Sequence, residues 1–139
     1  MNTGRFLLTI GTMTFLLAAC GGKGGAGGGT NKLQDAVFDI PVYEPSKLED
    51  AMGSKSGGDG FIVEGMGWEF KTTDDQKKVA DWYERKLPSS ATKTVDEDDG
   101  SIQFIYQPKG AEEHEQVEIF VKKGGFLIHE DVLPGKRKR

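Results

Sequence analysis

The chain has 139 residues, with 22 acidic and 18 basic side chains, so its formal net charge at pH 7 is −4. It contains a single cysteine, which excludes a disulfide bond within the chain. This length suits one small folded domain with additional segments, and the acidic balance disfavours nucleic acid as a partner.

Residues 1–19 have the three parts of a secretory signal peptide. Residues 1–5 carry one positive charge, from Arg5, and no acid. Residues 6–17 are mostly apolar, and the small residues Ala18 and Ala19 follow them. The apolar stretch is too short for a membrane span, which needs about 20 residues. We therefore expect residues 1–19 to direct export and to be removed.

The end of this signal, Leu17-Ala18-Ala19-Cys20, is followed by Gly21 and resembles the bacterial lipobox. The resemblance implies that Cys20 receives a thioether-linked diacylglycerol, that cleavage follows Ala19, and that the new amino group is acylated. Several acyl chains are needed because each buried methylene contributes about 0.8 kcal/mol and one chain holds a protein only marginally. The alternative is an ordinary signal peptide whose end contains a cysteine.

The lipobox resemblance also predicts a location. It implies a lipid-anchored protein on the periplasmic or extracellular side of a membrane. A glycine rather than an aspartate follows Cys20. By the same resemblance, this residue would permit transfer to the outer membrane if the source has two membranes.

A glycine-rich stretch follows the cysteine. Residues 21–29 contain seven glycines, interrupted only by Lys23 and Ala26. Such a composition predicts a flexible coil, and about a dozen residues of it span roughly 20 Å. A phosphate-binding glycine loop would need a preceding strand, and here the preceding segment is removed. We interpret residues 20–32 as a tether and residues 33–133 as an α+β domain.

Residues 134–139 form a basic tail that ends in Lys136-Arg137-Lys138-Arg139. Because residues 1–19 hold one basic residue and no acid, the mature chain has 17 basic and 22 acidic residues, a net charge of −5. Without the last four residues the net charge is −9. Such a tail is either an inert chain end or a segment that contacts anionic lipid headgroups. In the second case, each cation near the membrane surface contributes about 1 kcal/mol of binding free energy.

The domain begins with segments of contrasting composition. Residues 37–43 are apolar and extended, and Pro41 limits them to an edge or to a segment outside the sheet. Residues 52–60 are rich in Gly and Ser and predict a mobile loop. Residues 61–71 alternate with a period of two, which predicts a strand. Within this strand, Gly65 and Gly67 indicate a bulge or a close backbone approach.

Residues 73–87 predict an amphipathic helix. Thr73 followed by Gln76 is typical of a capping box, and Pro88 prevents continuation. Spacings of three and four place one apolar face on Val79, Trp82, Tyr83 and Leu87. We interpret the aromatic pair on this face as core rather than as a ligand platform.

After residue 88 the period returns to two. Residues 92–95 predict a short strand, residues 96–100 a turn, and Gly124-Gly125 a hairpin turn. Three further strands have apolar faces formed by Ile102, Phe104 and Tyr106, by Val117, Ile119 and Val121, and by Phe126, Ile128 and Val132. The order β-α-β-β-β-β predicts an α+β fold, with an antiparallel sheet of about four to five strands and one amphipathic helix packed on one face.

Two stretches of the body resemble a group of uncharacterised small bacterial lipoproteins. The first is Ile40-Pro41-Val42-Tyr43, and the second runs from Thr73-Asp74-Asp75 through Val79 and Trp82-Tyr83 to Leu87-Pro88. The group carries an I-P-x-Y-P opening and a T-x-D-x-x-x-V-x-x-F-Y-x-x-x-L helix. The resemblance implies a small α+β domain without an assigned activity, and it supplies no catalytic residue.

The run His129-Glu130-Asp131 raises the possibility of a metal site. Neighbouring residues on a strand point to opposite faces, so only His129 and Asp131 would share one side. The other histidine, His114, lies in a polar turn. We interpret these residues as a solvated edge and expect no metal.

The acidic run Asp96, Asp98 and Gly100 faintly resembles a calcium loop. A calcium loop of the helix-loop-helix type needs a bidentate Glu at its twelfth position and flanking helices. The twelfth position from Asp96 is Gln107, inside a predicted strand. The run therefore indicates a charged hairpin turn.

Nucleophilic catalysis needs a serine or cysteine beside a histidine base. Ser89, Ser90 and Ser101 lie in turn-like settings, and no signature surrounds either histidine. The sequence therefore predicts no enzyme and no cofactor.

The alternation of the strands also predicts a second apolar face. The helix is expected to cover Ile62, Trp68, Phe70, Phe104, Ile119 and Ile128. The opposite face would then carry Phe61, Val63, Ile105, Phe120 and Leu127. Contiguous apolar patches usually mark contact sites. In the interpretation that we favour, residues 37–43 fold across this face and cover it. The alternative is that the face stays open and binds a partner.

Together these features predict a non-enzymatic envelope lipoprotein that presents an interaction domain at a membrane surface. Its expected partners are the membrane, through the lipid anchor, and another envelope protein. The alternative is a lipoprotein that binds a small ligand or an ion, and an enzyme ranks third. A deep pocket with converging polar groups would favour the small-ligand alternative.

Overall fold

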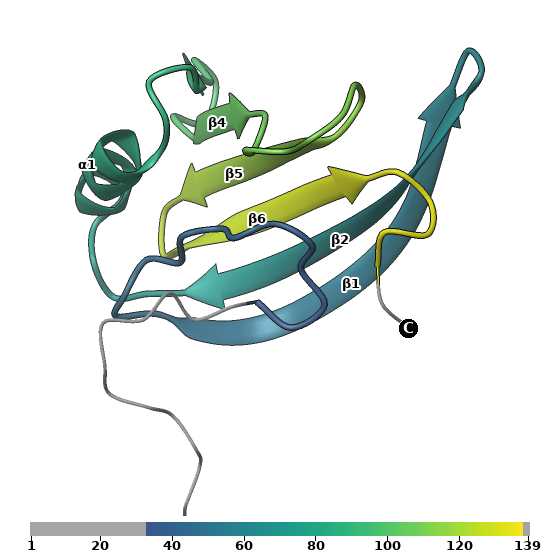
Figure 1. The fold of residues 1–139 in the computed structure, drawn as a ribbon. Helices are drawn as coiled ribbons and strands as arrows, with labels where there is room; N and C mark the ends of the chain where they lie inside the picture. The colour runs from purple at the N-terminus through teal and green to yellow at the C-terminus, as the bar shows by residue number, and fades with distance from the viewer. Residues whose placement is uncertain (1–32, 138–139) are drawn as a thin grey trace, which may run out of the picture.

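The computed structural model describes residues 33–137 (Figure 1). The proposed signal peptide, the lipidation residue Cys20 and the glycine-rich stretch lie outside the described residues, as do Lys138 and Arg139. The described chain forms one open antiparallel sheet and a single short helix. The α+β class is confirmed in this form.

The sheet has six strands rather than the four to five that we expected. Their order across the sheet is β1-β2-β6-β5-β4-β3, and every neighbouring pair is antiparallel. The elements are β1 (Lys47–Gly58), β2 (Phe61–Lys71), α1 (Gln76–Lys86), β3 (Thr92–Val95), β4 (Ile102–Tyr106), β5 (Gln116–Lys122) and β6 (Gly125–Val132).

The additional strand is β1, and the prediction of a mobile loop at residues 52–60 was wrong. β1 forms a long hairpin with β2, and Gly60 takes a positive φ of 93° in the connecting turn. Every residue of β1 is exposed, so the strand needs no apolar alternation. Backbone pairing with β2 holds β1 in the sheet. Because none of its side chains is buried, its sequence lacks the alternation that predicts a strand.

The helix starts later than expected. Asp75 is its N-cap, and the Asp75 carboxylate accepts a hydrogen bond of 2.8 Å from the backbone N–H of Lys78. The predicted capping box is therefore wrong. Gln76 instead donates through Nε2 to the backbone carbonyls of Gly100 and Val121. The helix ends at Lys86, directly before the C-cap residue and Pro88.

The core lies between α1 and the sheet face that we expected it to cover. The buried sheet residues on this face include Trp68, Phe70, Phe104, Ile119 and Ile128. From the helix, Val79 and Tyr83 are buried against them, and Trp82 packs at the margin. Ile62 departs from the prediction because its side chain, near the end of the hairpin, is 60% exposed.

Residues 33–45 complete the core on the same side as α1. A helix about 10 Å wide covers roughly two strands spaced about 4.8 Å apart, so much of a six-stranded sheet remains open. The segment crosses β6 and β2 in this space (Figure 1), and Ile40 and Tyr43 are buried in the core. The indole N–H of Trp68 donates to the carbonyl of Gln34 over 3.2 Å.

The favoured prediction that residues 37–43 cover the opposite face is therefore wrong. From the sequence, residues 37–43 could have covered either face of the sheet, because both faces carry large apolar residues. The buried carboxylate of Glu130 decides the side, since it accepts hydrogen bonds from the backbone N–H groups of Val37 and Phe38. We call the opposite side of the sheet the outer face.

Candidate functional site

Within residues 33–137, no helix or strand packs against the outer face. All five residues of the predicted interaction face have side chains on this side, as alternation indicated. Val63 is buried, with 4% of its surface exposed, and the others are half-buried: Phe61, Ile105, Phe120 and Leu127. The face is thus accessible while its large side chains partly shield one another.

The five apolar residues do not form one continuous patch. Phe120 lies directly opposite Leu127 in the β5–β6 pair, and Ile105 is opposite Glu118 in the β4–β5 pair. Phe61 and Val63 lie towards the end of the β1–β2 hairpin. Polar side chains of β5 and β6 separate the two groups. Strand register, which alternation alone does not give, determines this division.

We call these separating residues the polar belt: Gln116, Glu118, His129 and Asp131. The two oxygens of Glu118 accept amide hydrogen bonds, from Gln103 over 3.1 Å and from Gln116 over 2.7 Å. His129 Nε2 lies 3.0 Å from Asp131 Oδ1. The belt was missed in the sequence, although polar residues at alternate positions of residues 116–118 and 129–131 were a readable signal.

Gly65 of β2 makes room for His129, which lies opposite Gly67. A Cβ at Gly65 would come within 2.4 Å of Ser54 Oγ and 3.0 Å of His129 Cε1. A Cβ at Gly67 would make only ordinary contacts, the nearest at 3.6 Å from His129 Nδ1. The close neighbours of Gly65 are therefore side chains of both neighbouring strands, rather than the bulge or the close backbone approach that we expected.

Ser54, His129 and Asp131 do not form a nucleophilic triad. In such a triad, one imidazole nitrogen faces the acid and the other faces the hydroxyl. The structure has no hydrogen bond between Ser54 and His129, and the ring atoms nearest the Gly65 position are Cε1 and Nε2. Nε2 already contacts Asp131. Because Ser54 makes no hydrogen bond to the imidazole, the three residues lack the geometry of a triad.

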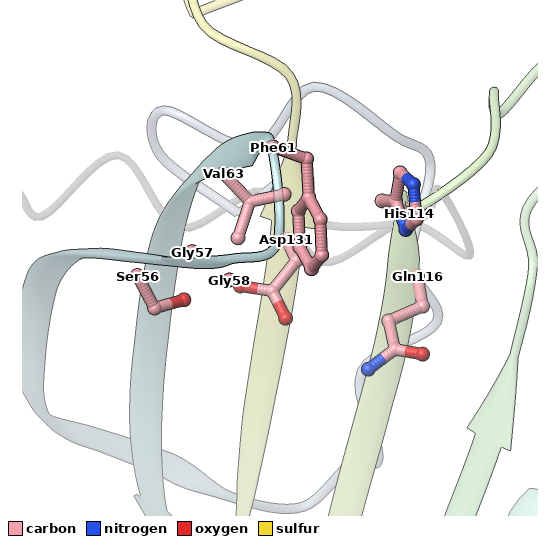
Figure 2. A pocket seen from close by; sticks show the side chains of 8 residues that line it. All are labelled: Ser56, Gly57, Gly58, Phe61, Val63, His114, Gln116 and Asp131. Carbon is pink, nitrogen blue, oxygen red and sulfur yellow. The ribbon is translucent and has the colours of Figure 1, made fainter.

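A cavity of about 400 Å³ lies at the hairpin end of the outer face (Figure 2). Its lining comes from β1, the start of β2, the loop before β5, and the facing ends of β5 and β6. The lining residues are Ser56, Gly57, Gly58, Phe61, Val63, His114, Gln116 and Asp131. This volume lies within the usual range of small-ligand pockets, roughly 300–1,000 Å³.

The Phe61 and His114 rings stack at one edge of this cavity. Their centroids are 4.0 Å apart and their planes differ by 1°. His114 has a positive φ of 69°, which is uncommon for a residue other than glycine. The two residues are far apart in the sequence, so neither alternation nor a local motif could have paired them.

The predicted calcium-like run is a hairpin turn. Asp96 Oδ1 accepts hydrogen bonds from the backbone N–H groups of Asp98 and Asp99, over 2.8 and 3.4 Å. Gly100 takes a positive φ of 73° and donates its N–H to the carbonyl of Asp96. Among the described residues, no group of three or more His, Cys, Asp or Glu side chains could hold a metal ion.

Two residues of the predicted basic tail belong to the folded body. Arg137 Nη1 lies 2.7 Å from Oε2 of the fully buried Glu130, and Lys136 Nζ lies 2.8 Å from Oε2 of the buried Glu115. Burial tends to raise the pKa of Glu115. The N–H groups of Glu112 and Leu133 together with Lys136 outweigh it, so the net shift lowers that pKa.

Comparison with known proteins places the chain in no family. No family model matches it, and neither a curated protein nor a solved structure does. In the part of the chain that the structure describes, no helix has the length and apolar character needed to cross a membrane. The arguments for function therefore come from the residues and their geometry.

Proposed function

We propose that this protein is a lipid-anchored envelope lipoprotein whose domain binds another envelope protein through the outer face, without catalysis. The observation that carries the proposal is the position of residues 33–45. They fill the core on the helix side, so large apolar side chains on the outer face stay uncovered within the described residues. Contiguous apolar surface on a folded domain usually marks a contact site, and the contiguous part here is Phe120 with Leu127, directly opposite each other on β5 and β6.

The anchoring half of the proposal rests on the lipobox resemblance at Cys20. The fold is compatible with it, because Leu33, where the described chain begins, packs against the core on the helix side. The chain thus enters the domain on the side away from the outer face. A partner could approach that face without meeting the entry point.

A second candidate function, binding of a small ligand, is favoured by one specific observation. The cavity at the hairpin end has a suitable volume and combines apolar side chains with polar ones. A protein partner and a small ligand would use neighbouring parts of the same face.

Site-specific photocrosslinking in cells of the source tests the protein-partner proposal. A photoreactive residue at Thr94, which is exposed on the outer face opposite Gln103, should give one adduct of defined mass. The same residue at Arg85, exposed on α1, should give none. Leu127→Lys should abolish the Thr94 adduct while circular dichroism stays unchanged. Equal adducts from both positions, or none from Thr94, would reject the proposal.

A further inference from the structure

We propose that the cavity at the hairpin end of the outer face binds a small organic cation, an ammonium group on a short apolar stem. This goes beyond the proposed function, because such a ligand would bind the domain whether or not a protein docks beside it.

The charge of the cavity is negative. Asp131 is the only carboxylate among its lining residues, and no lysine or arginine lines it. Glu118 adds a second carboxylate in the neighbouring part of the polar belt. The nearby cations Lys136 and Arg137 are held by Glu115 and Glu130. An anionic ligand would find no counter-charge here, whereas a cation would.

Asp131 supplies the one charged acceptor among the residues that line the cavity. The Asp131 side chain is only 14% exposed, and one of its oxygens contacts His129. Its second oxygen has no hydrogen-bond partner among residues 33–137. Asp131 lines the cavity, so this oxygen is available to accept a hydrogen bond from a ligand.

Two further polar groups line the cavity. Gln116 donates one N–H of Nε2 to Glu118, so its second N–H and its amide oxygen are both open to a ligand. Ser56 contributes a hydroxyl from β1, which can donate or accept. Figure 2 shows the carboxylate of Asp131, the amide of Gln116 and the hydroxyl of Ser56 in the lower part of the cavity, below Phe61. An ammonium group has three donors, which the Asp131 carboxylate and the oxygens of Gln116 and Ser56 can accept.

The apolar part of the cavity suits the stem of such a ligand. Val63 and the Phe61 ring line the cavity beside these acceptors, and the ring is fixed by its stack on His114. An aromatic ring beside a carboxylate also favours a cation over a neutral group of the same shape. His114 takes a positive φ of 69°, and such a conformation persists only where the surrounding structure holds it.

Calorimetric titration of the full-length protein in nonionic detergent tests the inference with three probes of equal length. These are n-pentylammonium, n-pentanol and n-pentanoate. We expect saturable binding of n-pentylammonium and no measurable binding of the other two. Equal binding of pentanol and pentylammonium, or no binding of pentylammonium, would overturn the inference.

Two variants locate the site. Asp131→Asn keeps the size of the side chain and should weaken pentylammonium binding about tenfold or more, as expected for loss of a hydrogen bond between charged groups. Ser56→Lys, on a fully exposed strand, places an ammonium group at the cavity and should have the same effect. Asp98→Asn removes an equal charge from the distant turn and should leave binding unchanged. Unaltered binding of pentylammonium in Asp131→Asn and Ser56→Lys would refute the site. Such a result would not affect the proposal of a protein partner, which the photocrosslinking experiment tests separately.

Discussion

Glu130 is a carboxylate at a core position of β6, and its burial is complete. It accepts hydrogen bonds from the backbone N–H groups of Val37 and Phe38, at 2.8–3.2 Å, and pairs with Arg137 over 2.7 Å. Arg137 in turn donates to the carbonyl of Asp35. One side chain thus joins the first and the last described segments to the centre of the sheet.

At this residue scale, we expect Glu130→Gln to lower the free energy of unfolding by about 3–5 kcal/mol. The change would leave the partly buried guanidinium of Arg137 without its counter-charge, and breaking a buried ion pair has a cost of this size. Urea denaturation measures the difference. Glu113→Gln is the matched control, because that side chain is 91% exposed and should change stability little. Equal effects of the two changes would contradict the assigned role.

A second residue-scale prediction concerns pH. The hydrogen bond from the Tyr43 hydroxyl, followed by that from Lys78, lowers the pKa of Asp74 below its ordinary value. A carboxylate with a lowered folded-state pKa contributes stability above its unfolded pKa, near about 3.9, and this contribution is lost as pH falls through the folded pKa. The stability advantage of the native chain over Asp74→Asn should therefore shrink below about pH 4. Denaturation series at several pH values would show this convergence, and a constant difference between the two proteins would exclude it.

At the scale of elements, the helix shows which local signals the sequence carries. Its apolar face at Val79 and Tyr83 was readable from spacing because burial repeats with the helical turn. The first residue of the helix could not be predicted, because Thr73 and Asp75 are both residue types that cap helices well. Only the course of the backbone determines which of them is the N-cap.

We expect Asp75→Ala to lower the free energy of unfolding by about 1 kcal/mol, the usual cost of losing an N-cap side chain. The lost interaction is the bond of 2.8 Å to the N–H of Lys78. Thr73→Ala, at the cap position that the sequence favoured, should have a much smaller effect. Thermal unfolding of both variants provides the measurement. A larger loss of stability for Thr73→Ala than for Asp75→Ala would contradict the assignment of Asp75 as the N-cap and support the capping box at Thr73.

The strands differ in how well alternation predicts them. β2, β5 and β6 were found because one side of each faces the core and the other does not. β1 was missed because all of its residues are exposed, and backbone pairing leaves no mark on composition. The side taken by residues 33–45 was also unpredictable, because it depends on the hydrogen bonds of Glu130, far away in the sequence.

At the scale of the whole molecule, the outer face combines features that lie far apart in the sequence. Alternation was sufficient to place Phe120 and Leu127 on it. The polar belt is placed there by the register of β5 on β6. The stack of Phe61 on His114 arises only when the hairpin and the loop before β5 meet. The apolar content of the candidate site was therefore predictable, whereas its division and its cavity were not.

The anchoring of the whole molecule rests on Cys20, which lies outside the described residues. Mass spectrometry of the mature amino terminus tests this proposal most directly. We expect a chain that begins at Cys20 and carries the added mass of a diacylglycerol and an amide-linked acyl group, and a Cys20→Ser variant should lose both. An unmodified Cys20, or cleavage at a bond other than Ala19–Cys20, would contradict the proposed lipid anchor.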